Sequence, residues 1–108
     1  MGRRKLESKF QLELKNKLYD TFPGCVIIKT DIQGYPDLLI IWQKRWAMLE
    51  VKRSEKERND PEPNQEYFVE MFDEMSFCSF IYPEIEEEVL DDLQRALKSN
   101  RSSRVSIR

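Results

Sequence analysis

GYPDLLIIW at residues 34–42 and WAMLEVK at residues 46–52 decide the fold of this chain. The two apolar runs are typical of neighbouring strands, and the short segment between them suits a tight turn. Charged residues nevertheless stand in or beside these strands at Asp37, Glu50 and Lys52. Burial of an unpaired charge costs several kcal/mol in practice. Either these strand ends reach solvent, where the charges form an ordinary ion-pair cluster, or the three charges form a functional site.

The turn between the two runs determines which residues face each other. We expect a two-residue hairpin loop at Lys44-Arg45, because such loops are the commonest hairpin connections. Counting outward from that turn places Asp37 opposite Lys52. Glu50 lies two residues before Lys52 and therefore shares its face. All three charges would then lie on one side of the hairpin, although a one-residue slip in register would move Asp37 to the other side.

The rest of the chain alternates between helical and strand patterns. Apolar residues at every third or fourth position predict helices, and runs of β-branched residues predict strands. The predicted helices cover residues 6–22, 64–75 and 84–98, and the predicted strands cover residues 25–30, 38–42, 46–52 and 77–82. This α-β-β-β-α-β-α order predicts an α/β fold and a single domain over residues 1–98. Residues 53–59 are expected to form a charged flexible stretch, residues 60–63 a helix breaker with Asn64 as the following cap, and residues 99–108 a basic disordered tail.

Two helices each direct a polar residue toward whatever they pack on. With about 100° per residue, Glu7 and Gln11 fall inside the apolar stripe of the first helix, and Glu13 falls on its border. The expected apolar face of the second helix is Phe68, Met71, Phe72 and Met75, and Gln65 lies on the same face as Phe68. Glu7 could instead serve only as a capping or dipole residue at the helix N-terminus. Glu7 and Gln65 are therefore candidate contributors to a site at the hairpin.

Charge is distributed unevenly along the 108 residues, which carry a net charge of −2. Residues 1–58 hold 13 Lys/Arg against 8 Asp/Glu, whereas residues 59–98 hold 2 against 12. A basic front half can bind phosphates whatever the total charge, although solvated surface charges would give the same count. The candidate phosphate contacts are Arg3, Arg4, Lys5, Lys9, Gln11, Lys29 and Arg53.

The two cysteines, Cys25 and Cys78, and the lack of histidine exclude the spacing of a zinc site or a disulfide framework. No stretch reads as a signal peptide or a membrane span, so we expect a reducing cytoplasm and no membrane partner.

Two carboxylates with neutral oxygens are what a hard cation requires. Mg²⁺ takes oxygen ligands and is usually held by one or two protein carboxylates together with water and substrate phosphate. Asp37 and Glu50 supply that pair, the carbonyl of Val51 could add a third oxygen, and Glu7 could add a carboxylate from the first helix. Lys52 beside them suits a group that orients the attacking water or steadies the phosphate. Cleavage of a nucleic-acid backbone is the chemistry that this set favours.

The same residues resemble a known nuclease signature. Pro36-Asp37, followed after twelve intervening residues by Glu50-Val51-Lys52, is similar to the motif of the PD-(D/E)XK nuclease superfamily. Residues 34–40 resemble the form found in the VRR-NUC group and in archaeal-type Holliday junction resolvases. Glu7 precedes residues 10–11, and residues 63–65 follow Lys52. This order is similar to the VRR-NUC and phage-type pattern. The resemblance covers residues 6–82.

The resemblance implies a restriction-endonuclease-like core with a central mixed sheet flanked by helices. It also implies a DNA endonuclease that depends on Mg²⁺, for which Mn²⁺ substitutes, and that selects branched DNA such as Holliday junctions or flaps. The implied metal ligands are Asp37 and Glu50, with Lys52 catalytic, Gln65 the trailing glutamine and Glu7 the helix acid, for which Glu13 is the alternative. A homodimer in the cytoplasm of a bacterium or a phage-infected host is the expected setting.

Two other classes of function remain open. The fold could serve as a nucleic-acid-binding module that is inactive or depends on a partner, because residues 59–98 are acidic and suit a protein partner better than DNA. The chain could also be a small toxin or regulatory protein without an active site, which requires the three charges of the hairpin to be coincidental.

Overall fold

The computed structural model describes residues 8–60 and 62–98. The helices are α1 (Lys9–Thr21), α2 (Glu55–Arg58), α3 (Gln65–Met75) and α4 (Glu86–Lys98), with a 3-10 turn, η1 (Pro83–Ile85), directly before α4. The strands are β1 (Val26–Lys29), β2 (Leu38–Trp42), β3 (Arg45–Val51) and β4 (Phe77–Ile81). The predicted order of elements is therefore present, with α2 and η1 in addition. The predicted tail at residues 99–108 lies outside the described residues.

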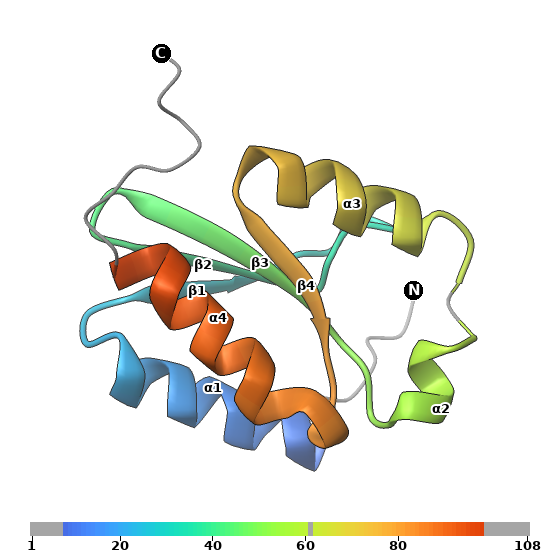
Figure 1. Ribbon diagram of the computed structural model, residues 1–108, viewed down its shortest axis with the longest axis horizontal. Helices are drawn as coiled ribbons and strands as arrows, with labels where there is room; N and C mark the ends of the chain where they lie inside the picture. Colours follow the sequence, from blue (N-terminus) through green and yellow to red (C-terminus); the bar gives the residue numbers. More distant parts are fainter. Residues whose placement is uncertain (1–7, 61, 99–108) are drawn as a thin grey trace.

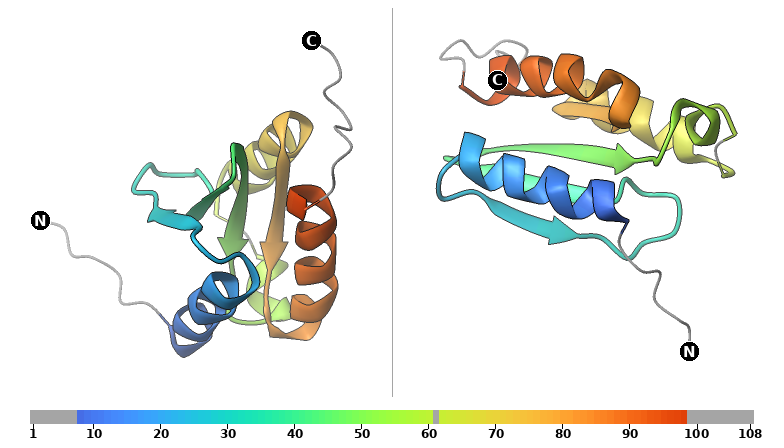
Figure 2. Two further views of the ribbon diagram at one scale, coloured as in Figure 1. Left: turned by 90° about the vertical axis from the view of Figure 1, so that its left-hand side faces the viewer. Right: turned by 90° about the horizontal axis from the view of Figure 1, so that it is seen from below.

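The strands form one mixed sheet in the order β1-β2-β3-β4 (Figure 1). β1, β2 and β3 are antiparallel neighbours, whereas β4 runs parallel to β3. The helices lie on both faces of this sheet: α1 and α4 cover one face, and α3 covers part of the other (Figures 1 and 2). The expected α/β class, with a mixed sheet flanked by helices, is confirmed at this level.

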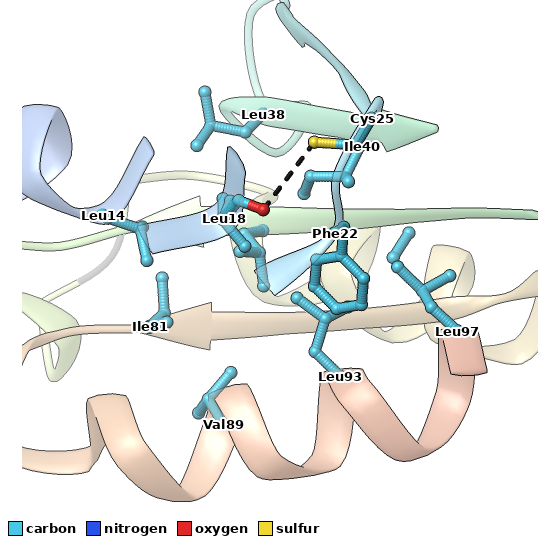
Figure 3. Packing of buried hydrophobic residues seen from close by; sticks show 12 residues of the cluster. Leu14, Leu18, Phe22, Cys25, Leu38, Ile40, Ile81, Val89, Leu93 and Leu97 are labelled. Carbon is cyan, nitrogen blue, oxygen red and sulfur yellow. Dashed lines mark hydrogen bonds between the residues drawn. The ribbon is translucent and has the colours of Figure 1, made fainter. Parts of the chain in front are cut away.

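The main hydrophobic core lies between the sheet and the pair α1 and α4. Leu14, Leu18 and Phe22 follow the four-residue spacing of the first helix and are fully buried. Figure 3 shows them gathered with side chains of the strands and of α4 in one layer. A smaller cluster on the opposite face joins α3 to β3 and β4 through Val69, Met48, Cys78 and Phe80. The α1/α4 side is thus the better covered of the two faces.

The hairpin turn lies one residue earlier than expected. Trp42 pairs with Arg45, so the two loop residues are Gln43 and Lys44, both with positive φ (52° and 72°). Positive φ at both loop positions is the geometry of the turn that matches the twist of a hairpin. The predicted pairing of Asp37 with Lys52 is therefore wrong. Moving the turn by one position shifts every partner by two residues, which preserves the face of each side chain.

Four further local features differ from the sequence expectation. Residues 53–59, expected to be flexible, contain α2, which Ser54 caps by accepting a hydrogen bond from the Glu57 N–H. α1 begins at Lys9 rather than at residue 6, with Ser8 as its cap. Asn64 precedes α3 in a left-handed conformation without a side-chain capping bond. Met75, expected on the buried face of α3, is 60% exposed.

Gly34 joins the loop before β2 to α3. Its φ is +88°, and a Cβ atom there would lie 3.2 Å from a ring carbon of Phe68. The neighbouring Tyr35 ring packs against Phe68 and Phe72, at centroid distances of 4.8 and 5.1 Å. The approach of the loop to α3 therefore depends on a residue without a side chain.

We predict that Gly34→Ala lowers the free energy of unfolding by about 1–3 kcal/mol, because it adds a steric contact with Phe68 to the strain of a positive φ. Gly24→Ala is the matched control, since Gly24 has a similar φ of +86° but nothing within 4 Å of the added atom. Urea unfolding followed by tryptophan fluorescence measures both variants. Equal losses for the two substitutions would show that the contact with Phe68 contributes nothing.

Candidate active site

Asp37 is fixed to strands on both sides just before β2 begins. Its Oδ2 atom accepts a hydrogen bond from the main-chain N–H of Val51 at 3.0 Å, which ties it to the end of β3. Its main-chain carbonyl accepts a hydrogen bond from the N–H of Thr30 at 2.9 Å, just past the end of β1. The side chain of Asp37 therefore has a defined direction toward the end of β3. For Val51, the contact with Asp37 is made by the N–H group and not by the carbonyl that the sequence suggested as a ligand.

Glu50, Lys52 and Gln65 form a buried hydrogen-bonded group beside it. Their exposed fractions are 3%, 6% and 8%. The Nζ atom of Lys52 donates to Oε1 of Gln65 at 2.7 Å, and Nε2 of Gln65 donates to Oε2 of Glu50 at 2.9 Å. The Lys52 ammonium also lies 3.8 Å from Oε2 of Glu50. Gln65, the first residue of α3, thus bridges the lysine and the carboxylate.

The face of the sheet that carries these groups follows from the strand register. Glu50 alternates with Leu49 and Val51 and lies on the same face as Met48, which packs on α3. Leu39 belongs to that face as well, and Asp37 lies two residues before it. The sequence prediction that Asp37, Glu50 and Lys52 share one side of the hairpin is therefore confirmed, although the pairing from which it was derived is not.

Burial dominates the electrostatics of Glu50. Loss of solvent is the first cause that raises the pKa of this carboxyl from its usual value of 4.5 to about 8, and the charge of Asp37 is the second. The Lys52 ammonium acts in the opposite direction but does not compensate. Without a further cation, Glu50 therefore holds a proton at neutral pH. Its Oε1 atom is buried and has no hydrogen-bond partner.

That orphaned oxygen is the feature that fits a bound cation. A buried acceptor without a partner costs about 1–3 kcal/mol, which a cation ligand would offset. Asp37 and Glu50 provide the two carboxylates that Mg²⁺ usually takes from a protein. Within residues 8–60 and 62–98, no group of three or more metal-ligating side chains is present. The described part of the site therefore offers two carboxylates, which suits a cation that keeps several water ligands.

The first helix reaches the same end of the sheet. Figure 2 shows the N-terminal end of α1 at the end where β3 terminates. Glu7 itself lies outside the described residues. The alternative acid, Glu13, has an exposed side chain that lies 4.0 Å from Lys9 on the same helix, so it is not part of the buried polar group. Gln11 is only 9% exposed, and its Nε2 atom is buried without a hydrogen-bond partner.

The candidate phosphate contacts divide into three groups. Arg3, Arg4 and Lys5 lie outside the described residues. The remaining basic candidates are exposed; among them, the Arg53 guanidinium makes an ion pair with Glu57 at 3.0 Å. The burial of Gln11 removes its side chain from any exposed surface, which argues against the phosphate contact expected from the sequence.

One participant was missed from the sequence. The N–H of Glu62 donates to Oε1 of Gln65 at 3.1 Å, and its carbonyl accepts from the Gln65 N–H at 3.2 Å. The charge of Glu62 also raises the pKa of Glu50. Glu62 lies three residues before Gln65, which begins α3. This spacing is typical of reciprocal capping contacts and was the available signal in the sequence.

No family model, curated protein or solved structure matches the chain. Among the described residues, no helix has the length and apolar character needed to cross a membrane.

We predict that the stability of the metal-free protein falls as the pH rises. Because the folded pKa of Glu50 is about 8 against 4.5 in the unfolded chain, the folded state binds the extra proton between these values. The contribution of this proton is complete below pH 4.5 and is lost through pH 8, at up to about 1.4 kcal/mol per pH unit. Glu50→Gln should flatten this dependence, as measured by urea unfolding in a chelating buffer between pH 5 and pH 8.5.

The matched control is Glu74→Gln, which changes an exposed carboxylate on α3. It should retain the slope of the unaltered protein. If Glu50→Gln and the unaltered protein lose stability in parallel across this range, Glu50 does not hold the proton.

Proposed function

We propose that this chain is an Mg²⁺-dependent DNA endonuclease of the PD-(D/E)XK type, built on a restriction-endonuclease-like core. One observation carries the proposal: Asp37, Glu50 and Lys52 share one end of one sheet face, and Gln65 joins the lysine to the glutamate there. Buried charge is costly, and a small domain has only about 5–15 kcal/mol of total stability. A functional site therefore explains this group of residues better than an ion-pair cluster does.

Asp37 and Glu50 are the residues that would hold the cation, with Glu7 as a further acid and the Val51 carbonyl as a further oxygen. When bound, Mg²⁺ (or Mn²⁺) supplies a Lewis acid that polarises the scissile phosphate and acidifies water. The residues fit this group because Oε1 of Glu50 is buried without a partner and Asp37 is close enough to raise the pKa of Glu50.

The Lys52 ammonium is a positive charge that is already in place before the reaction begins. An ammonium has three donors, and Gln65 accepts one of them. The others can donate to a phosphate oxygen or to the attacking water, where charge develops in the transition state. Gln65 is a positioning residue, since it holds the ammonium and the Glu50 carboxylate at fixed distances.

The proposed substrate is branched DNA, either a four-way junction or a flap. The support is the basic front half of the chain, with exposed Lys9, Lys29 and Arg53 among the described residues. The choice of branched over linear DNA rests on the resemblance of residues 6–82 to small junction-specific nucleases.

We predict cleavage of a labelled four-way junction or flap in the presence of Mg²⁺ or Mn²⁺, with less cleavage of duplex and single-stranded DNA. Lys52→Met should lower the single-turnover rate by about 100-fold or more, because it removes the charge that steadies the phosphate while keeping the volume of the side chain. Lys56→Met, in exposed α2, is the matched control and should retain activity. Absence of cleavage of all four DNA structures with either metal would reject the proposal.

We predict one Mn²⁺ site per chain in calorimetric titration, lost in Asp37→Asn. Asp31→Asn is the control, because Asp31 is an exposed loop carboxylate near Asp37 in sequence. Binding should release a proton near pH 7, since Glu50 must ionise to accept the cation. Titrations in two buffers of different ionisation enthalpy measure that proton.

The second candidate is a nucleic-acid-binding module that is inactive or depends on a partner. It is favoured by the acidic charge of residues 59–98, which suits a protein partner better than DNA. The titration separates the two candidates, because a module kept only for binding would show no Mn²⁺ site.

A further inference from the structure

The α3 side of the sheet is only half covered. α3 packs on β3 and β4 through Val69 and Phe72. β1 and β2 form the other half of this face, where the exposed fractions of Val26, Ile28 and Ile41 are 51%, 44% and 36%. Contiguous apolar surface of this kind on a small protein marks a binding site.

A groove runs between this open half of the sheet and α3. Its volume is about 540 Å³, which lies within the range of about 300–1,000 Å³ that is typical of small-molecule sites. Side chains of β2, β3 and α3 form its walls, with Leu39, Trp46, Met48 and Phe72 among them. The walls are almost wholly apolar, so the groove suits an apolar occupant.

The floor of the groove offers almost no hydrogen bonds. β2 lies between β1 and β3, so its main-chain groups are used in the ladders on both sides. The hydroxyl of Thr30, which also lines the groove, donates to the carbonyl of Pro36. An extended peptide in the groove would therefore leave its own main-chain groups unpaired, whereas an alkyl chain has no such groups.

Charge is concentrated at one end of the groove. Lys44, in the hairpin turn, is exposed and borders the groove there. Arg45 follows, but its guanidinium donates to the carbonyl of Leu97 in α4, which covers the opposite face of the sheet. Among the described residues that line the groove, none is acidic. The groove thus has apolar walls and an ammonium group at one end, which are the features that bind an amphiphile with an anionic head.

We propose that the groove binds one molecule of an anionic amphiphile, such as a medium-chain carboxylate, with its alkyl chain along β2 and its carboxylate at the Lys44 ammonium. The chain would remove the exposed apolar side chains of β2 from water, which is favourable. A free molecule fits better than a membrane surface, because α3 beside the groove contains four acidic residues and no basic one, and anionic headgroups would repel it. The test of this proposal does not depend on nuclease activity.

Fluorescence quenching locates the ligand, because the two tryptophans of the chain lie in different surroundings. Trp46 lines the groove, whereas the Trp42 indole packs on Phe22 and donates to the carbonyl of Pro23. The probe is dodecanoate with bromine in the middle of its chain, since bromine quenches indole fluorescence at contact. Trp42→Phe, which retains Trp46, should show saturable quenching below the concentration at which the probe forms micelles. Trp46→Phe, which retains Trp42, should show none.

Calorimetric titration tests the chain and the head of the ligand separately. Octanoate should bind about 100-fold more weakly than dodecanoate, because it buries four fewer methylene groups. Dodecyltrimethylammonium, which has the same chain with a cationic head, should bind about 10-fold more weakly than dodecanoate. Lys44→Glu should reverse this preference between the two heads. Lys56→Glu is the matched control, because it changes an exposed lysine of α2 and should retain the preference.

Circular dichroism of each variant confirms that it is folded. Absence of saturable quenching of Trp46 overturns the proposal, as does equal quenching of the two tryptophans. An unaltered preference for the anionic head in Lys44→Glu also overturns it. Binding to vesicles of phosphatidylglycerol without binding of monomeric dodecanoate contradicts it as well, because the open half of the sheet would then be a membrane contact.

Discussion

The structure depends on holding the carboxylate of Glu50 where only 3% of its surface meets water. A charge in that position needs donors, and the donors must arrive from elements that are distant in sequence. Gln65 reaches it from the start of α3, and Lys52 reaches it from beyond the end of β3. The need of the Glu50 carboxylate for polar contacts therefore holds the start of α3 beside the end of β3. Even so, one carboxylate oxygen is left without a partner, and burial together with the charge of Asp37 raises the pKa of Glu50 to about 8.

The two faces of the sheet have different physical roles. The α1/α4 side is an apolar core in which Leu14, Leu18, Phe22 and Leu93 are fully buried. The α3 side carries the polar group at the end of β3 and the smaller cluster directly beside it, where Phe80 pairs with Glu50. Stability is therefore supplied mainly by the face that has no candidate site. This separation lets buried charges persist on the other face, where they would otherwise consume a large part of the stability of a small domain.

Much of the fold could be predicted from periodicity because the strands and helices are strongly apolar on one side. The stripe of the first helix and the sharing of a face by Asp37, Glu50 and Lys52 both follow from side-chain spacing alone. The position of the turn could not be predicted, because nothing local distinguishes Gln43-Lys44 from Lys44-Arg45. That position depends on the φ values and on pairing along the whole hairpin.

Other errors have a tertiary cause. Met75 belongs to the apolar pattern of α3 but faces outward, because this helix packs on the sheet through Val69 instead. α2 was missed since a four-residue helix has almost no periodicity to read. Glu62 joined the site only because Gln65 turns back to its N–H, a contact that depends on where α3 begins. Residues whose roles depend on a helix start are the least visible in a sequence.

The aromatic contacts around Tyr35 have a mechanical consequence. Tyr35 lies two residues before Asp37, and its ring packs against Phe68 and Phe72 of α3. Gln65 begins that same helix. Because Asp37 is itself hydrogen-bonded to the ends of β1 and β3, a drift of α3 relative to the sheet would strain the loop at Tyr35, and the ring contacts therefore resist that drift. Asp37 and Gln65 are thus held relative to each other in two ways, through their hydrogen bonds to residues 50 and 51 of β3 and through the rings that join the Asp37 loop to α3.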